Sequence, residues 1–303
     1  MRRSGLLSLF GLFAWVAASL AANATTTKRL AAPTATFEEQ VAELVNQERA
    51  SCTLAACPLS PLKLVSVLGA LADEHSGSMA KGDYFSHCDF SSGLDLFERM
   101  IAAGYFYFSA AENIAGTAAT PAAVVAQWMG SAAHRANILG NGFREQGVGY
   151  FFESGDLANV DYDGNSDCDC SDAGETCSYP AITRYWTQIF GMRNSVYPLV
   201  IEGERHETSS GTVDLYVYGP ATAIDMRFSN DGATWSVWQT FAHDAVWTLA
   251  AGDGLRTVFS EVRNATAVYR SCDRIWRTGA GGPELFVDGF DCDGSGAWSP
   301  VEP

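Results

Sequence analysis

Helical and strand-like sequence patterns follow one another in this chain and do not alternate. Apolar residues recur at helical spacing in several segments between about residues 36 and 139. Strand-like stretches rich in β-branched and aromatic residues then appear at 147–152 and 182–190. Because a parallel sheet is built from alternating strands and helices, this order favours an α+β sandwich over a parallel α/β fold.

Capping residues mark where the helices begin and end. Thr36 is followed three residues later by Glu39, which together form a capping box. Thr120 precedes Pro121, and proline is favoured at the first position of a helix. Gly104 ends a further helical pattern. We therefore expect helices beginning near residues 37 and 121, and others around 64–79, 94–103 and 132–139.

The character of the sequence changes at about residue 197. Five short strand candidates with turn signals between them run from 212 to 272, and Asn230-Asp231-Gly232 is a hairpin signal. This pattern predicts a small immunoglobulin-like β-sandwich over 197–278. Four tryptophans fit either a platform that stacks on sugars or, as is more usual within strands, core and edge packing: Trp235, Trp238, Trp247 and Trp276.

Both ends of the chain differ from the folded part. Residues 1–24 have a short basic start, an apolar run and an A-x-A exit, which predicts a cleaved signal peptide. We expect residues 25–35 to be a flexible start of the mature chain and 279–303 to be an acidic, glycine-rich tail. Residues 285–298 of this tail resemble a short terminal segment of exported proteins in some Gram-negative bacteria. No later segment is long and apolar enough to span a bilayer. We therefore expect a secreted, periplasmic or outer-surface protein.

Eight cysteines fit an oxidising compartment, where disulfides persist. The absence of any C-x-x-C pair argues against a zinc ribbon and a thioredoxin-type site. We expect Cys52 to pair with Cys57, and Cys272 with Cys292. The pairing of the other four stays open: Cys88, Cys168, Cys170 and Cys177.

The formal net charge is −16. A chain this acidic is repelled by nucleic acid and by anionic lipid, so neither is expected as a bulk partner. The sequence does not define an oligomeric state.

Three residues that can bind a metal or move protons lie within short polar motifs. His87 closes the motif YFSH, Glu112 and Asn113 open ENIAG, and His134 lies in a segment that begins at Trp128. Only five histidines occur in 303 residues, so their use here is selective. Two imidazoles and a carboxylate that meet in a cleft can bind a divalent ion such as zinc and leave a water position open.

Seven motifs in order resemble one known family: HSGSMA (75–80), YFSH (84–87), AGY (103–105), ENIAG (112–116), TPAAVVAQWMGSAAHRANIL (120–139), REQGVGY (144–150) and YWTQIFG (185–191). They resemble the bacterial branch of the CAP superfamily, which groups cysteine-rich secretory, antigen 5 and pathogenesis-related proteins, over about 37–192. The resemblance implies an α-β-α sandwich over 36–192, with a cleft that holds two histidines and two acids. By motif these are His87, Glu112 and His134, while Ser131 stands at the position of the second acid.

The resemblance leaves the function of the cleft open. The leading hypothesis is binding of a divalent cation or a small apolar ligand, with the β-sandwich attaching the protein to a surface or to an extracellular protein or glycan. Alternatively, these residues form a polar network that only stabilises the fold. A metal-dependent hydrolase of peptides or lipid esters would use His87, Glu112 and His134. Adhesion through the β-sandwich alone is a further reading.

An acidic, cysteine-bearing insert spans 153–180. Asp161, Asp163, Asn165 and Asp167 alternate oxygen ligands much as the front of a calcium loop does. The sequence is not an EF-hand, because no glutamate stands at the twelfth position. A solvated acidic loop without an ion is the alternative interpretation.

Overall fold

The computed structural model describes residues 32–280 and residue 292. The expected signal peptide, residues 25–31 and nearly all of the expected tail lie outside the described residues. Within the part of the chain that is described, no helix has the length and apolar character needed to cross a membrane.

Residues 32–193, which we call the α-β-α unit, are built on one four-stranded sheet with the order β1-β4-β7-β3. β1 pairs with β4 in parallel and the other pairs are antiparallel. β3 therefore forms one edge of the sheet. The strands are β1 (Lys63–Leu64), β3 (Tyr107–Gly116), β4 (Glu145–Phe152) and β7 (Arg184–Arg193).

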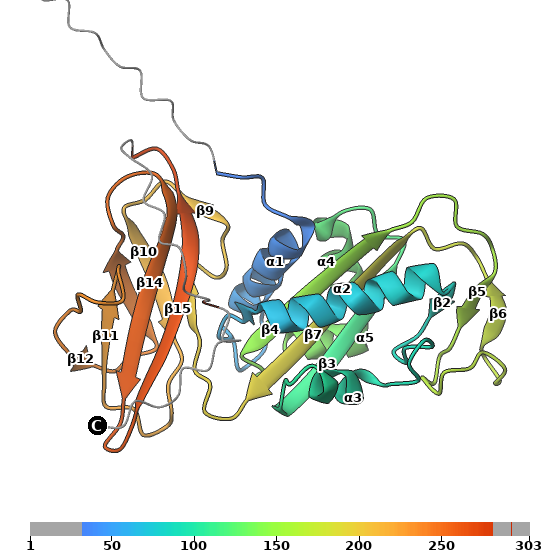
Figure 1. The fold of residues 1–303 in the computed structure, drawn as a ribbon, viewed down its shortest axis with the longest axis horizontal. Coiled ribbons are helices and arrows are strands. Elements are labelled where there is room, and N and C mark those ends of the chain that lie inside the picture. The colour runs from blue at the N-terminus through green and yellow to red at the C-terminus, as the bar shows by residue number, and fades with distance from the viewer. Residues whose placement is uncertain (1–31, 281–291, 293–303) are drawn as a thin grey trace, which may run out of the picture.

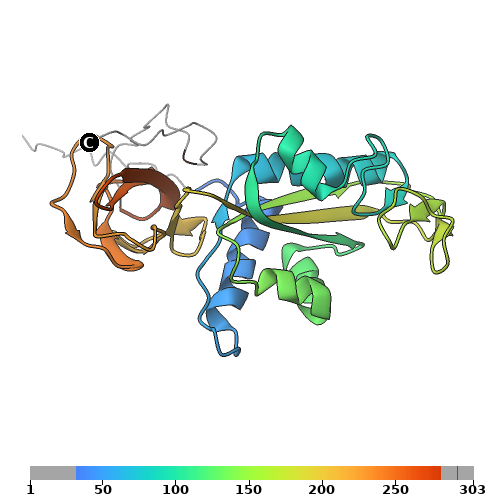
Figure 2. The same cartoon turned by 90° about the horizontal axis from the view of Figure 1, so that it is seen from below.

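Helices cover both faces of this sheet (Figure 2). One face carries α2 (Ser66–Lys81) and α3 (Leu96–Ala102), and the other carries α1 (Phe37–Ser51), α4 (Pro121–Gly130) and α5 (Ala132–Ile138). A hydrophobic cluster that includes Trp128 and Trp186 fills the space beneath α1 and α4. The three layers confirm the predicted α-β-α sandwich.

Side-chain caps begin three of the helices. Thr36 and Glu39 form the expected capping box at α1, and Thr120 accepts a hydrogen bond from the Ala123 amide at α4. A second capping box at α3, Asp95 with Glu98, was not recognised in the sequence. Each box satisfies backbone N–H groups that have no partner inside the helix.

Helix α2 lies directly on β4 because two strand residues have no side chain. A Cβ at Gly147 would collide with the backbone of Leu68, and one at Gly149 with the backbone of Ala72. This close approach fixes the position of α2 and therefore of His75, which α2 carries into the interior.

The acidic insert lies at the end of the sheet farthest from residues 197–278 (Figure 1). It forms a small sheet with the order β2-β5-β6. The strands are β2 (Tyr84–Phe85), β5 (Val160–Tyr162) and β6 (Thr176–Tyr179). Because β2 comes directly before His87, the insert supports one side of the candidate cleft.

Residues 197–278, which we call the β unit, contain two sheets with the orders β13-β10-β8 and β12-β11-β14-β15-β9. Both contribute to one hydrophobic cluster, which is consistent with the predicted β-sandwich. The immunoglobulin-like topology stays a prediction. The strands are β8 (Leu199–Ile201), β9 (Glu207–Thr208), β10 (Thr212–Val217), β11 (Asp225–Ser229), β12 (Gln239–Thr240), β13 (Asp244–Thr248), β14 (Gly254–Arg263) and β15 (Val268–Arg277).

Three of the four tryptophans in the β unit have identifiable packing partners. Trp247 packs on Phe228, with ring centroids 5.5 Å apart. The Arg227 guanidinium lies 5.0 Å from the ring centroid of Trp235 and 4.4 Å from that of Trp238. These contacts favour packing over a sugar platform for these three side chains.

A buried ion cluster joins the two units. The Lys63 ammonium of β1 contacts Glu204, 3.1 Å away, and Asp273 of β15. The Tyr218 hydroxyl also donates to the Pro61 carbonyl across the same junction, at 2.9 Å. The two units are therefore packed together and not merely tethered.

Candidate functional site

Four disulfides are present among the described residues. Cys52–Cys57 and Cys272–Cys292 are the two pairs that the sequence analysis expected. The four cysteines whose pairing the sequence left open form the disulfides Cys88–Cys168 and Cys170–Cys177. No described cysteine is free, so none is a candidate nucleophile.

The insert anchors the loop that carries His87. The Cys88–Cys168 disulfide joins the residue after His87 to the insert. The Ser86 hydroxyl donates to Asp163 Oδ2 at 2.7 Å and accepts from the Cys88 amide at 2.8 Å. A covalent bond and two hydrogen bonds therefore fix the backbone on both sides of the imidazole.

Glu112 of β3 contacts both His87 and Arg99. Its Oε1 lies 2.9 Å from Nδ1 of His87, and its Oε2 accepts from Nη2 of Arg99 at 2.9 Å. The Glu112 side chain is 2% exposed, whereas that of His87 is 40% exposed. The carboxylate is therefore internal, and the imidazole it contacts reaches the surface.

Surrounding charges keep Glu112 ionised. Burial alone would raise its pKa, but the charge of His75, the hydrogen bond from His87 and the charge of Arg99 lower the pKa to about 2. A carboxylate that accepts from Nδ1 of His87 holds the proton on that nitrogen. In the neutral imidazole, Nε2 of His87 then carries the free lone pair.

His75 and Asp89 extend this network behind Glu112. Nε2 of His75 lies 2.9 Å from the Ser86 carbonyl and 3.9 Å from Glu112, and Nδ1 lies 4.0 Å from Asp89. His75, together with hydrogen bonds from Ser91, holds the pKa of Asp89 well below its usual range despite burial. The His75 side chain is fully buried.

His134 of α5 is next to β3. Its backbone carbonyl accepts from Nδ2 of Asn113 at 3.3 Å, and Asn113 accepts in turn from Asn137 at 2.9 Å. Burial and the charge of His87 lower the pKa of His134, which favours the neutral imidazole. Its Nδ1 is buried and has no hydrogen-bond partner among the described residues.

Ser131 occupies the junction between α4 and α5, as the sequence indicated. It stands at the N-cap position of α5, and its side chain makes no capping hydrogen bond there. The position of the second acid is therefore filled by a short neutral side chain.

The structure gives the three expected metal ligands different roles. His87, Glu112 and His134 are not among the sets of three described side chains whose ligand atoms all lie within 4.8 Å of one another. Glu112 already contacts His87 and Arg99 through its two oxygens. Glu112 therefore orients His87, and metal binding by His87 and His134 stays a prediction.

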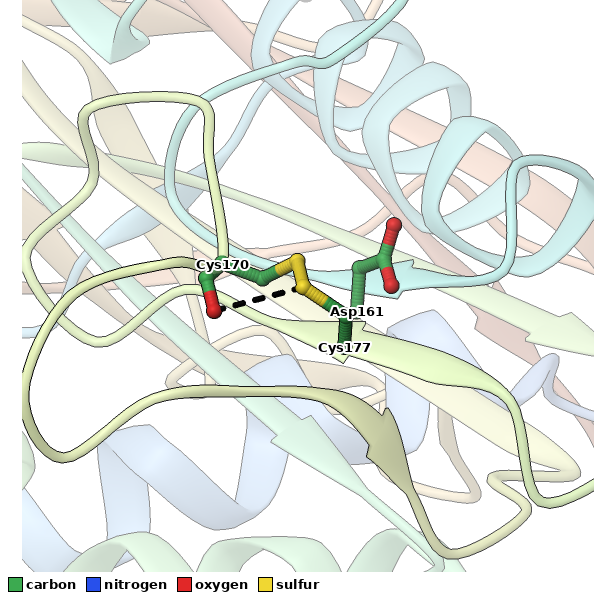
Figure 3. A group of neighbouring side chains, drawn as sticks. All are labelled: Asp161, Cys170 and Cys177. Carbon is green, nitrogen blue, oxygen red and sulfur yellow. Dashed lines mark hydrogen bonds between the residues drawn. A yellow bond between two sulfur atoms is a disulfide. The ribbon is translucent and has the colours of Figure 1, made fainter.

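Of the four expected calcium ligands in the insert, Asp163, Asn165 and Asp167 lie together and Asp161 is grouped elsewhere. Asp163 and Asp167 lie together with Glu175, which the sequence analysis did not single out. Asp161 lies instead beside Cys170 and Cys177 (Figure 3), whose sulfurs are bonded to each other and are not available as metal ligands.

The insert loop also satisfies much of its own hydrogen bonding. Asp163 accepts from the amides of Ser166 and Cys168, and Glu175 accepts from those of Gly164 and Asn165. Calcium binding by Asp163, Asn165 and Asp167 therefore stays a prediction, with no unpartnered group to favour it.

The comparisons with known proteins concern the α-β-α unit. Residues 42–160 match the model described as "CAP: Cysteine-rich secretory protein family". The chain is 36% identical over 141 residues to the uncharacterized protein YkwD of Bacillus subtilis. The aligned region covers 46% of this chain and 52% of that protein. The chain thus spans about half the length of this curated relative.

Two solved structures show a weaker similarity. An extracellular protein containing an SCP domain from Bacillus anthracis has a TM-score of 0.37 at 23% identity, covering 52% of this chain and 40% of the other. An outer surface protein from Borrelia burgdorferi has a TM-score of 0.38 at 15% identity, covering 54% of this chain and 100% of the other.

Proposed function

Residues 42–160 belong to the CAP, or cysteine-rich secretory protein, family, and from this premise we propose that the cleft of His87, Glu112 and His134 binds a divalent cation such as zinc. One observation carries the proposal. The buried Glu112 carboxylate lies 2.9 Å from Nδ1 of His87, which leaves Nε2 of a half-exposed imidazole free for a ligand. Metal-binding histidines are commonly oriented by a carboxylate in this way.

His87 and His134 are the proposed metal ligands. The lowered pKa of His134 keeps its imidazole neutral, as metal binding requires, and its buried Nδ1 has no other partner among the described residues. Ser131 adds no charge, so solvent would fill the remaining positions. Zinc in such an open site would supply Lewis acidity to a bound water.

We test the proposal by calorimetric zinc titration of the mature chain, residues 25–303. We expect one-to-one binding that His134→Ala abolishes and that Glu112→Gln weakens by about 10–100-fold. His243→Ala, in the β unit, is the matched control and should bind zinc as the wild type does. Equal binding by the wild type and His134→Ala would refute the proposal.

The hydrolase alternative has its own readout in the same proteins. Zinc-dependent cleavage of a peptide or lipid ester that disappears in His134→Ala, with the fold intact, would establish it. Binding without turnover would support the cation-binding function.

We also propose export and an attachment role for the β unit. Four disulfides and the family description support export, because disulfides persist in oxidising compartments. Val237 is the most exposed large apolar side chain of the β unit, at 85%, so the attachment role is tested at this position. Val237→Glu should reduce binding of the whole chain to bacterial cell envelopes, measured by co-sedimentation, if this role is correct.

A further inference from the structure

Three carboxylates meet at the base of the insert, away from the cleft and from the predicted calcium loop. Asp83 lies in the turn between α2 and β2, and Glu153 and Asp156 follow β4. One oxygen of each lies within 4.8 Å of the others. Within the described part of the chain, none of the three forms an ion pair with a basic side chain.

A buried hydroxyl without a partner faces these carboxylates. Tyr185 of β7 is fully buried, and its hydroxyl has no hydrogen-bond partner among the described residues. Tyr185 packs in one apolar cluster with Tyr84, the residue after Asp83, and with Ile182, whose amide donates to Asp156. Burial and the charges of Asp156, Glu153 and Asp83 raise the pKa of its phenol. Oε2 of Glu153 is also buried without a described partner. The Tyr185 hydroxyl and Oε2 of Glu153 are therefore two buried polar atoms that lack a hydrogen-bond partner among the described residues.

We propose that Asp83, Glu153 and Asp156 form a calcium site, with the Tyr185 hydroxyl beside it. Calcium takes oxygen ligands at about 2.3–2.6 Å, so ligands on opposite sides of the ion are about 5 Å apart. One oxygen of each of the three carboxylates lies within 4.8 Å of the others, so one ion could contact all three. Calcium accepts a variable coordination geometry and suits such a group better than magnesium, which demands a stricter octahedral geometry.

Existing contacts orient two of the ligands. Oδ2 of Asp156 accepts from the Ile182 amide at 2.6 Å, and Oδ2 of Asp83 accepts from Asn159 at 3.1 Å. Glu153 is different, because its Oε2 is buried and has no hydrogen-bond partner among the described residues. A divalent cation would bind this oxygen and balance the repulsion among the three carboxylates.

Calcium here would join segments that are distant in the sequence. Asp83 belongs to the turn that leads to His87, while Glu153 and Asp156 lie at the start of the insert. The site differs from the loop of Asp163 and Asp167 in having a buried carboxylate oxygen, Oε2 of Glu153, without a partner among the described residues. The ion would therefore fix the base of the insert.

The test is the melting temperature of the mature chain in chelator and across a calcium titration. The wild type should melt at a higher temperature as calcium rises, with a dissociation constant on the order of 0.1–1 mM, typical of extracellular calcium modules. Glu153→Gln should weaken calcium binding by at least about tenfold, since affinity follows the ligand charge. Asp167→Asn, in the insert loop, is the control and should respond as the wild type does.

The possible outcomes are distinct. A response lost in Glu153→Gln and kept in Asp167→Asn supports the site. No response in the wild type overturns it, and so does a response lost only in Asp167→Asn. Melting in chelator shows whether Glu153→Gln folds; if it does not, Asp83→Asn takes its place under the same criteria.

Discussion

At the scale of single residues, the cleft depends on how Glu112 is held. A carboxylate with only 2% of its side chain exposed remains charged because His75, His87 and Arg99 surround it. Removing one partner of a buried ion pair leaves the other charge uncompensated, which costs more than the pair itself contributes. Glu112 therefore both stabilises the fold and sets the orientation of His87.

Glu112→Gln should lower the free energy of unfolding by about 3 kcal/mol at neutral pH, because the buried Arg99 loses its charge partner. The pKa of Glu112 is about 2 in the folded chain and near 4.5 when unfolded, so its contribution is complete above about pH 4.5 and is lost as the pH falls toward 2. Chemical denaturation at several pH values should show the gap between the two proteins closing over that interval. A gap that does not depend on pH would contradict this account.

The short motifs located His87, Glu112, Asn113 and His134, but not the groups behind them. Arg99 and Glu112 are 13 residues apart on a helix and a strand, and no local spacing indicates that they meet. The available signal was an arginine on the core-facing side of α3, between Leu96 and Met100. Such pairings depend on how elements pack, which periodicity does not determine.

At the scale of elements, the close packing of α2 on β4 positions His75 in the network around Glu112. The absence of side chains at Gly147 and Gly149 lets the helix backbone contact the strand. Helix α2 carries His75, so the separation of helix and strand also sets the distance from His75 to Glu112.

Gly149→Ala should destabilise the chain by about 3 kcal/mol, since the new methyl group would collide with the backbone of Ala72 and Asp73. Gly130→Ala is the matched control, because a Cβ there meets nothing within 4 Å. Urea denaturation of both variants measures the difference. Equal stabilities would mean that the helix can move away from the sheet at little cost.

The Cys88–Cys168 disulfide connects the insert to the His87 loop across 80 residues. Replacing both cysteines by serine should cost about 4 kcal/mol, whereas removing Cys170–Cys177, with a separation of 7, should cost about 2 kcal/mol. Thermal unfolding of the two double variants tests this order. The reverse order would show that strain or residual structure outweighs the loop entropy.

The longer helices were predictable because caps and apolar periodicity are local signals. Strands of two residues were not, as β1, β2 and β9 show. Each is defined by pairing with a strand that is distant in the sequence, such as β1 with β4. The sequence therefore predicted the layers of the α-β-α unit but not the edge at which the β unit attaches.

At the scale of the whole molecule, one ammonium faces two buried carboxylates at the junction. Lys63 contacts both Glu204 and Asp273, and it cannot neutralise both. Burial and the charge of Asp273 raise the pKa of Glu204 to about 8, although Lys63 opposes the shift. The junction is therefore most stable when Glu204 is protonated.

Stability contributed by the protonated Glu204 should be complete below about pH 4.5 and should decrease as the pH rises through about 8. Glu204→Gln keeps the shape without the charge, so it should stabilise the chain by about 2 kcal/mol at pH 9 and have little effect at pH 4. Glu202→Gln is the control, because Glu202 is close to Glu204 in the sequence and its side chain is less buried. Thermal unfolding at the two pH values measures the effect, and an equal gain at both would contradict it.

Nitrogen-15 NMR of the five histidine side chains tests the central claim most directly, because it observes each ring nitrogen. Before zinc is added, His87 should show a proton on Nδ1 and a free Nε2, set by Glu112. One equivalent of zinc should shift Nε2 of His87 and a ring nitrogen of His134 together, and leave His243 unchanged. Zinc that shifts neither His87 nor His134, or a His87 proton on Nε2, would contradict the account.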